Sequence, residues 1–233
     1  MKKFAFTLAE TLIVMGIIGV VAALTLSNLN SSTGDKEKVA KVKKIYQNLN
    51  DAFGRAQAVY GPYEDWCINI TGNDCSKRCG ERITEFMKIS KNCELSDETC
   101  FADKPVNLDN GSKYMDAIGK STYKSNYRFI TSDGTSIALG GITLIDIDGP
   151  NKGNNSMGRD IFMFEIINNS IVPECSRQQN VVQNFSLSPS TRGTCSSLWI
   201  ISFDNADYLK IDSNGKCPDG KTILDGTTNI TCK

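Results

Sequence analysis

The first 29 residues constrain this 233-residue chain more than any other segment, because a short basic leader is followed by a long apolar run. The run extends from Phe6 to Leu29, and as a helix it would be about 36 Å long, enough for the hydrocarbon core of a bilayer. It contains one carboxylate, Glu10. Inserting a charge there costs roughly 2.5–3.5 kcal/mol, so such a residue usually has a partner and a function. The run predicts a transmembrane helix over residues 6–29.

Two plainer interpretations of this segment are a cleaved secretory signal peptide and a simple signal anchor. A signal peptide would keep its apolar core free of charge and end at a small-residue cleavage site. Glu10 lies inside the core, and residues 21–25 make a poor cleavage site. In a simple anchor, Glu10 would only extend toward headgroups one helical turn away.

The segment resembles the class III signal of type IV pilins and type II secretion pseudopilins, in the motif Phe4-Ala5-Phe6-Thr7-Leu8-Ala9-Glu10 and in the run Gly16-Ile17-Ile18-Gly19 that follows. The resemblance covers about the first 60 residues, the length of the long N-terminal helix that it implies. It implies that a prepilin peptidase cuts between Ala5 and Phe6, so that residues 1–5 are a leader peptide, and that Phe6 is then N-methylated. Family members usually carry Gly where this chain has Ala5 and often Pro where it has Ser27.

The resemblance also implies a mode of assembly. Cleavage frees an amine on Phe6, which in stacked subunits would pair with Glu10 of a neighbour. The chain would then be a structural subunit of a type IV pilus or a type II secretion pseudopilus, and not an enzyme. Its partners would be other pilin or pseudopilin subunits, the prepilin peptidase, the pilus or secretion assembly machinery, and the membrane.

Cysteine usage predicts the location of the remaining chain. All nine cysteines follow Tyr60, and the chain has neither His nor a Cys-x-x-Cys pair for a metal site. Dispersed cysteines in a loop-rich region indicate disulfides and an oxidising compartment. The cysteines thus favour an extracytoplasmic head. Together with this, the resemblance implies a single-pass protein of the bacterial inner membrane, with a cytoplasmic N-terminus and a periplasmic head, that becomes a periplasmic or cell-surface filament after assembly.

The nine disulfide candidates are Cys67, Cys75, Cys79, Cys93, Cys100, Cys175, Cys195, Cys217 and Cys232. In the C-terminal region, the neighbouring pairings are Cys175–Cys195 and Cys217–Cys232, although spacing alone does not determine connectivity. Because nine is odd, one thiol stays free or pairs between subunits.

A second helical pattern follows a polar interruption at residues 30–35. Apolar residues recur at spacings of three and four from Val39 to Tyr60, and Gly61-Pro62 ends the pattern. The pattern predicts an extracytoplasmic half of the long helix over residues 30–62. Strand-like runs follow at residues 127–132, 135–139, 142–147 and 160–166. Asp133-Gly134 indicates a two-residue type I′ hairpin loop between the first two.

These elements predict an α+β, pilin-like fold. A long N-terminal helix, transmembrane in its first half, would pack on a small antiparallel β-sheet with disulfide-stapled loops. The globular head would span residues 63–233: a Cys-rich loop region at 63–127 with a helical patch near 81–89, the sheet at 127–167, and a C-terminal Cys-containing region at 168–233. Within the last region, residues 198–201 would form a short helix or a buried strand.

An acidic loop follows the third predicted strand. Asp146, Asp148 and Asp160 could converge as hard oxygen ligands for calcium, with loop carbonyls completing the shell, as in the acidic loops of some pseudopilins. The alternative is a solvated loop whose carboxylates cap turns. The segment is not an EF-hand, since Pro150 interrupts the alternating ligands and a closing Glu is absent. Calcium is the one cofactor that the sequence suggests.

The sequence argues against the enzyme classes considered. The absence of His excludes Ser-His-Asp and Cys-His sites, and no Gly-x-Ser-x-Gly elbow is present. Nucleic acid is not an expected partner, because the formal net charge is zero and aromatic residues do not alternate with the basic ones. Two alternatives stay open. One is a signal-anchored periplasmic binding or adhesive domain acting as a monomer, which would keep residues 1–5; the other is a competence pilin for DNA uptake.

Overall fold

The computed structural model describes residues 8–102, 125–177, 193–211, 216–220 and 232. The chain divides into two compact units, Met1–Lys38 and Val39–Lys233. The first unit contains the N-terminal part of helix α1. The second contains the rest of α1 and all of the strands described below.

Helix α1 (Leu8–Tyr60) has 53 residues. The polar stretch at residues 30–35 belongs to the helix, because polar residues lower helix propensity by less than about 1 kcal/mol each and the flanking turns compensate. The helix ends where Gly61-Pro62 predicts. Gly61 has a φ of +80°, and its N–H donates to the carbonyl of Gln57 at 2.9 Å. This is the left-handed C-terminal cap that glycine adopts without steric cost.

The predicted transmembrane half of this helix, residues 6–29, is wrong. Within the residues that the structure describes, none of the helices combines the length and the apolar character that crossing a bilayer requires. Such a helix takes about 20 consecutive, predominantly apolar residues, and the described part of α1 does not supply that run. The predicted pilin-like fold class is corrected in this respect, and the predicted single-pass location in the inner membrane is wrong with it.

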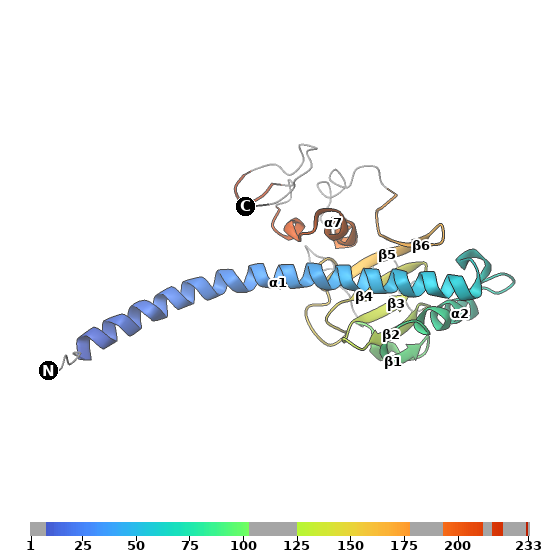
Figure 1. Ribbon diagram of the computed structural model, residues 1–233, viewed down its shortest axis with the longest axis horizontal. Helices are drawn as coiled ribbons and strands as arrows, with labels where there is room; N and C mark the ends of the chain where they lie inside the picture. The colour runs from blue at the N-terminus through green and yellow to red at the C-terminus, as the bar shows by residue number, and fades with distance from the viewer. Residues whose placement is uncertain (1–7, 103–124, 178–192, 212–215, 221–231, 233) are drawn as a thin grey trace. The chain divides into compact units, whose positions relative to one another are not determined.

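Within the described residues, six strands form one antiparallel sheet, whose spatial order is their order in sequence (Figure 1). The strands are β1 (Ile89–Glu94), β2 (Tyr127–Thr131), β3 (Ser136–Leu139), β4 (Ile142–Asp146), β5 (Ile161–Ile167) and β6 (Ser170–Pro173). The four predicted strands correspond to β2–β5. Strands β1 and β6, which lie at the two edges, were not predicted.

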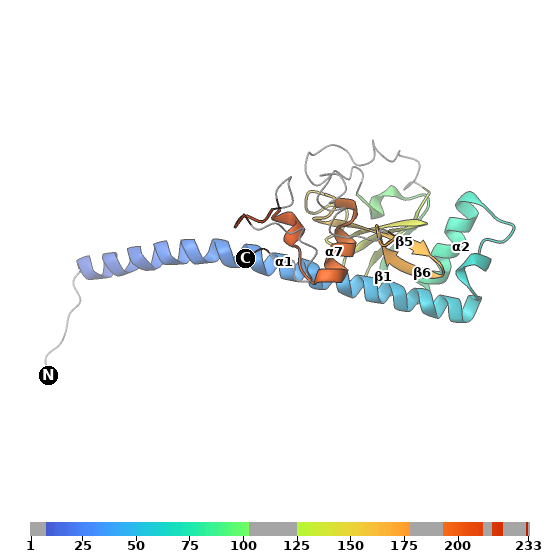
Figure 2. The ribbon, with the colours of Figure 1, turned by 90° about the horizontal axis from the view of Figure 1, so that it is seen from above.

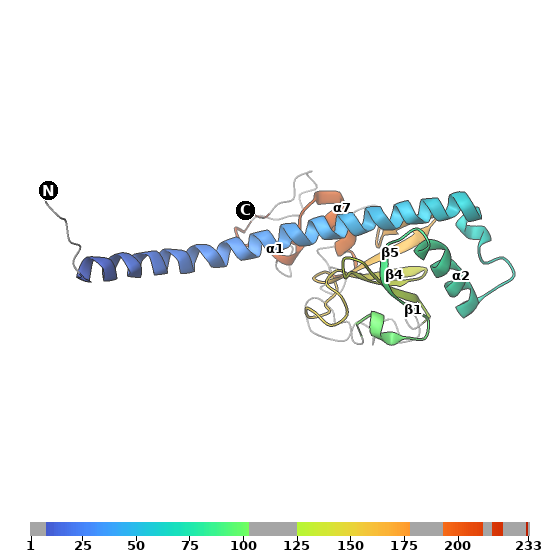
Figure 3. The ribbon, with the colours of Figure 1, turned by 60° about the horizontal axis from the view of Figure 1, so that its bottom comes forward.

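Two shorter helices accompany the sheet. Helix α7 (Ser196–Phe203) packs on β5 and β6 (Figure 2), so residues 198–201 are helical and not a strand. Helix α2 (Gly72–Thr84) packs on β1 and β2 (Figure 3). The helical patch predicted at 81–89 is therefore misplaced, since α2 ends at Thr84. Short 3-10 turns are η1 (Tyr63–Asp65), η2 (Glu98–Cys100) and η3 (Asp207–Leu209).

The second part of α1 forms one layer of the main core. Its buried stripe consists of Val39, Val42, Ile45, Leu49, Ala52, Phe53 and Ala56. This stripe belongs to the same cluster as the inward-facing residues of the central strands, among them Phe129, Ile137 and Phe164. Tyr46 stacks on Phe164 with ring centroids 5.3 Å apart. The predicted stripe ends at Ala56, because Val59 is 61% exposed.

The β2–β3 hairpin is present, but its turn differs from the predicted one. Thr131 and Thr135 close the hairpin, since the N–H of Thr131 donates to the carbonyl of Thr135 at 2.9 Å. The loop therefore contains three residues, and among them only Gly134 has a positive φ, +85°. A type I′ turn would need positive φ at both central positions. Asp133 instead accepts a hydrogen bond from the Thr131 hydroxyl at 2.7 Å.

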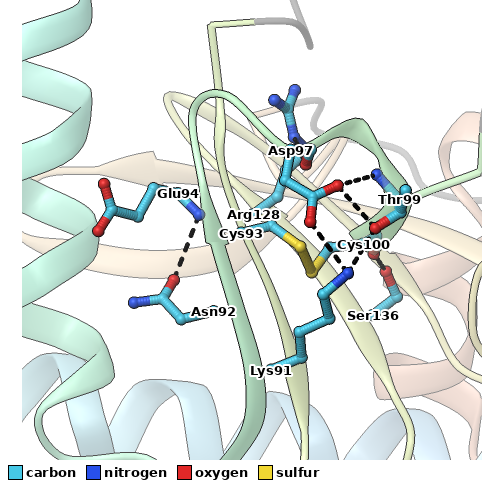
Figure 4. A network of polar contacts seen from close by, with 9 residues as sticks. All are labelled: Lys91, Asn92, Cys93, Glu94, Asp97, Thr99, Cys100, Arg128 and Ser136. Atoms are coloured by element: carbon cyan, nitrogen blue, oxygen red, sulfur yellow. Dashed lines mark hydrogen bonds and ion pairs between the residues drawn. A yellow bond between two sulfur atoms is a disulfide. The ribbon is translucent and has the colours of Figure 1, made fainter.

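Polar contacts attach the loop after β1 to the other face of the sheet (Figure 4). Arg128 alternates with the core residues of β2 and is only 1% exposed. Its guanidinium donates to the backbone carbonyls of Asp97, at 3.2 Å, and of Leu95. The disulfide Cys93–Cys100 closes the same loop.

Four disulfides join Cys67–Cys75, Cys93–Cys100, Cys175–Cys195 and Cys217–Cys232. The last two pairs are the neighbouring pairings considered from the sequence, and they are confirmed. Cys79 is the ninth cysteine; it is buried and carries a free thiol. All eight bonded sulfurs pair within the chain.

Candidate functional site

The predicted processing site lies outside the described residues. Ala5 and Phe6, the residues on either side of the predicted cut, belong to the segment 1–7. Glu10 lies in the first turn of α1, and only its backbone is described. The cleavage, the N-methylation of Phe6 and the pairing of Glu10 therefore stay predictions.

Large apolar side chains cover the described start of α1. Each is at least 52% exposed, and they are Leu8, Leu12, Ile13, Val14, Met15, Ile17, Ile18, Val20 and Val21. Four consecutive apolar positions, residues 12–15, occupy every side of a helix because each residue turns it by about 100°. Soluble proteins rarely expose continuous apolar surface of this kind unless it is an interaction site.

The three aspartates predicted as calcium ligands lie at or between two neighbouring strands. Asp146 is the last residue of β4, where it faces Ser136 of β3 and Ile161 of β5 in the register. Asp148 and Asp160 lie in the loop that joins β4 to β5. The N–H of Ile147 donates to the backbone carbonyl of Asp160 at 2.9 Å, which brings the two ends of the loop together.

Asp146 is completely buried, and its carboxylate is incompletely hydrogen bonded. Oδ1 accepts from the N–H of Gly149 at 3.1 Å, whereas Oδ2 has no hydrogen-bond donor. Oδ1 of Asp148 and the side-chain oxygen of Asn155 are likewise buried without a partner. Burial, together with contact with the Asp148 carboxyl, raises the pKa of Asp146 well above its ordinary range. Two unsatisfied carboxylates next to each other are unfavourable unless a cation or a proton is shared between them.

Asp160, at the other end of the loop, lies near the carboxylate of Asp148. Its Oδ2 accepts from the N–H of Asn154 at 2.9 Å and of Ser156 at 3.4 Å. A Cβ atom on Gly153 would lie 2.7 Å from Oδ2 of Asp148 and 2.8 Å from Oδ2 of Asp160. Gly153 also has a φ of +64°. Only glycine lets the backbone approach both carboxylates so closely.

These residues fit a calcium ion by ligand chemistry. Calcium takes six to eight oxygen ligands from carboxylates, amide oxygens and carbonyls, and the loop offers all three kinds. The buried acceptor atoms without donors belong to Asp146, Asp148 and Asn155. The three carboxylates do not yet meet at one point, because among the described residues only one group of three such ligands lies within 4.8 Å, and it consists of cysteines. Binding calcium would therefore require the loop to tighten.

That group consists of Cys67, which follows η1, and of Cys75 and Cys79, which lie in α2. It is not a metal site as it stands, since Cys67 and Cys75 are joined in a disulfide and cannot act as thiolate ligands. Neither the grouping of these three cysteines nor a role for Asn155 was predicted from the sequence. The sequence Asn154-Asn155 in the acidic loop could have indicated an amide ligand. No sequence pattern indicates that Cys79 lies next to the disulfide, because that contact depends on where α2 packs.

Comparison with known proteins adds no assignment. No family model matches the sequence, and neither the curated proteins nor the solved structures contain a significant match.

Proposed function

We propose that this chain is a structural subunit of a pilin-type or pseudopilin-type filament, cut between Ala5 and Phe6 and assembled through the first part of α1. The proposal rests on the resemblance of residues 4–19 to the class III signal and on the two different surfaces of α1.

The contrast along α1 is the observation that carries the proposal. From Val39 to Ala56, one stripe of the helix is buried in the core of its own unit. From Leu8 to Val21, the large apolar side chains are exposed. A second copy of the same segment would cover them by helix-to-helix packing, as apolar ridges fit between those of a neighbour. We therefore assign the start of α1 to contacts with other subunits.

Glu10 gives this packing its register. Buried among apolar helices, a lone carboxylate is strongly destabilising, and so is a lone amine. The amine that cleavage would free on Phe6 precedes Glu10 by four residues in the sequence, so subunits shifted along a common axis could pair one group with the other. N-methylation keeps the positive charge of the amine, so the pairing would persist.

The acidic loop would stabilise the head of such a subunit. Calcium held by Asp146, Asp148, Asp160 and Asn155 would neutralise the carboxylates and bind the loop to the ends of β4 and β5. The folded state would then gain stability from calcium in solution, because the ion binds the folded loop and not the unfolded chain.

The test is the Glu10→Ala variant in the native host, with filaments sheared from cells and quantified against processed protein. We expect Glu10→Ala to be made and cut before Phe6, but to yield far fewer filaments, and Glu10→Gln to fall between it and wild type. The matched control is Glu37→Ala, which removes an exposed glutamate farther along α1 and should assemble normally.

Two results would contradict the proposal. One is an intact Met1 on the native protein, which would mean that no peptidase acts on it and would favour a monomeric binding or adhesive domain. The other is wild-type filament yield from Glu10→Ala at equal levels of processed protein. Salt-dependent retention of DNA by the purified protein would instead support a DNA-uptake role.

A further inference from the structure

Three sulfur atoms meet where η1 and its following segment contact α2. Sγ of Cys79 lies 3.6 Å from Sγ of Cys67, which is already bonded to Cys75. All three Sγ atoms lie within 4.8 Å of one another. The odd thiol of this chain is therefore not isolated, because it lies in van der Waals contact with a disulfide.

The spacing in α2 explains the arrangement. Cys75 and Cys79 are four residues apart in one helix, so their side chains lie on the same face. Cys67 reaches that face from the segment after η1. Either cysteine of the helix is consequently within reach of the same partner without a change of helical register.

The surroundings hold the free sulfur as a thiol. Burial raises the pKa of Cys79, although a hydrogen bond with Tyr63 and the charges of Arg82 and Arg78 act in the opposite direction. Cys79 is 7% exposed, whereas Cys75 and Cys67 are partly exposed. The one free thiol thus lies at the least accessible of the three positions.

We propose that Cys67, Cys75 and Cys79 form a thiol–disulfide exchange site, in which Cys67 pairs with either helical cysteine. The thiolate of Cys79 attacks Sγ of Cys67, the Cys67–Cys79 bond forms, the Cys67–Cys75 bond breaks, and Cys75 leaves as a thiolate. Cys79 loses its proton to solvent and Cys75 takes one up. The step needs no oxidant or reductant, since the number of disulfides is unchanged.

The consequence of the exchange is that the free thiol moves from a buried to a partly exposed position. A thiol at Cys75 can react with a thiol reagent or form a mixed disulfide with another protein, whereas Cys79 is shielded. The site is separate from the acidic loop and from the apolar start of α1, so it does not depend on the filament proposal.

Trypsin digestion separates the two isomers by mass. The enzyme cuts after Arg55, Lys77, Arg78 and Arg82, so Cys67 and Cys75 share the peptide 56–77 while Cys79 lies in the peptide 79–82. The starting isomer gives peptide 56–77 with an internal disulfide. The exchanged isomer gives peptide 56–77 linked to peptide 79–82, with Cys75 free.

The experiment incubates the native, oxidised full chain with iodoacetamide, quenches samples over time and maps them without reduction. We expect loss of the internally bonded peptide and growth of the linked pair that carries the label on Cys75. Label on Cys79 with the Cys67–Cys75 bond intact would overturn the proposal, and so would the absence of label after prolonged incubation of the folded protein. The Cys93–Cys100 pair serves as the internal control and should stay unlabelled, because scrambling by unfolding would open it as well.

Two variants complete the test. Cys79→Ser removes the attacking thiol, so Cys75 should stay unlabelled; equal labelling of Cys75 in this variant would overturn the proposal. Cys75→Ser should contain a Cys67–Cys79 disulfide when purified in oxidised form. Two free thiols at Cys67 and Cys79 in that protein would show that the pair cannot form.

Discussion

Gly80 of α2 packs directly against the ring of Tyr127 on β2, so closely that a Cβ atom on Gly80 would lie 2.0 Å from Cγ of the tyrosine. Both residues are buried. The contact fixes the depth at which α2 lies on the sheet, and it explains why glycine occupies this position inside the helix despite its cost in helix propensity.

We therefore expect Gly80→Ala to lower the free energy of unfolding by about 1–3 kcal/mol, because a methyl group at this point forces the ring or the helix to move. Urea titration measures the change. Gly54→Ala is the matched control: Gly54 lies on the exposed side of α1 with nothing within 4 Å of a Cβ, so alanine should stabilise the protein by about 0.5–1 kcal/mol. Equal effects at the two positions would contradict the packing argument.

Calcium should raise the melting temperature of the protein. A ligand that binds only the folded state at about a hundred times its Kd adds about 2.7 kcal/mol of stability, and magnesium should add less because it demands a tighter octahedral shell. Differential scanning calorimetry with calcium, magnesium or chelator measures both effects.

The Asp146→Asn variant should separate the stability of the calcium-free protein from its response to calcium. In chelator it should be at least as stable as wild type, because the contact between two carboxylates at Asp146 and Asp148 is relieved. It should also respond to calcium much less. Asp51→Asn, which alters an exposed carboxylate on α1, should retain the full calcium response. A calcium response that survives in Asp146→Asn would exclude this loop as the site.

Asp133 should contribute to resistance against acid. Burial raises the pKa of its carboxyl, but hydrogen bonds from Thr131, Lys44 and Thr135 outweigh burial and hold the pKa at about 2. A folded-state pKa below the unfolded value of about 3.9 favours folding above pH 4, and this contribution disappears as the pH falls toward 2. The free energy of unfolding of Asp133→Asn should therefore be lower than that of wild type at neutral pH. The two values should converge as the pH falls toward 2. A difference that is constant across this range would mean that Asp133 acts only through its shape.

Disulfides should account for eight of the nine cysteines in the purified, oxidised protein. Alkylation after denaturation without reductant should add one group per chain, and nine after reduction. Loss of Cys175–Cys195, whose partners are 20 residues apart, should cost about 1 kcal/mol more than loss of Cys93–Cys100, whose partners are 7 apart, because the longer loop restricts the unfolded chain more. Nine groups without reductant would contradict the connectivity.

The elements that could be predicted from the sequence are those with a strong periodic pattern. The stripe from Val39 to Ala56 has regular apolar spacing because it buries one side of α1 against the main core. Strands β3–β5 are rich in apolar residues because successive side chains pack alternately into the main core and into a second buried cluster on the other face of the sheet. The edge strand β1 buries little more than Cys93, so its sequence has no alternation to detect. Helix α2 is rich in polar residues and glycine, and its position follows from packing on Tyr127 and from the Cys67–Cys75 bond.

The candidate sites were predictable to different degrees. Three aspartates in one loop are visible in the sequence, but the burial of Asp146 depends on its place at the end of a central strand. The sulfur cluster could not be deduced, because the spacing of Cys67, Cys75 and Cys79 is compatible with several pairings. The transmembrane prediction rested on the apolar composition of residues 6–29, whereas no helix among the described residues is long and apolar enough to span a membrane.

The strand order has a consequence for folding during synthesis. Since every strand of the sheet pairs with its neighbour in sequence, β2 to β6 can be added one by one as the chain emerges, without waiting for a distant partner. The helical layer does not share this advantage. The stripe of α1 is made first, yet Tyr46 meets Phe164 only after more than a hundred further residues have been translated. During that interval the nascent helix presents an uncovered apolar stripe, and a chaperone or the surface of another molecule is the natural temporary cover for it.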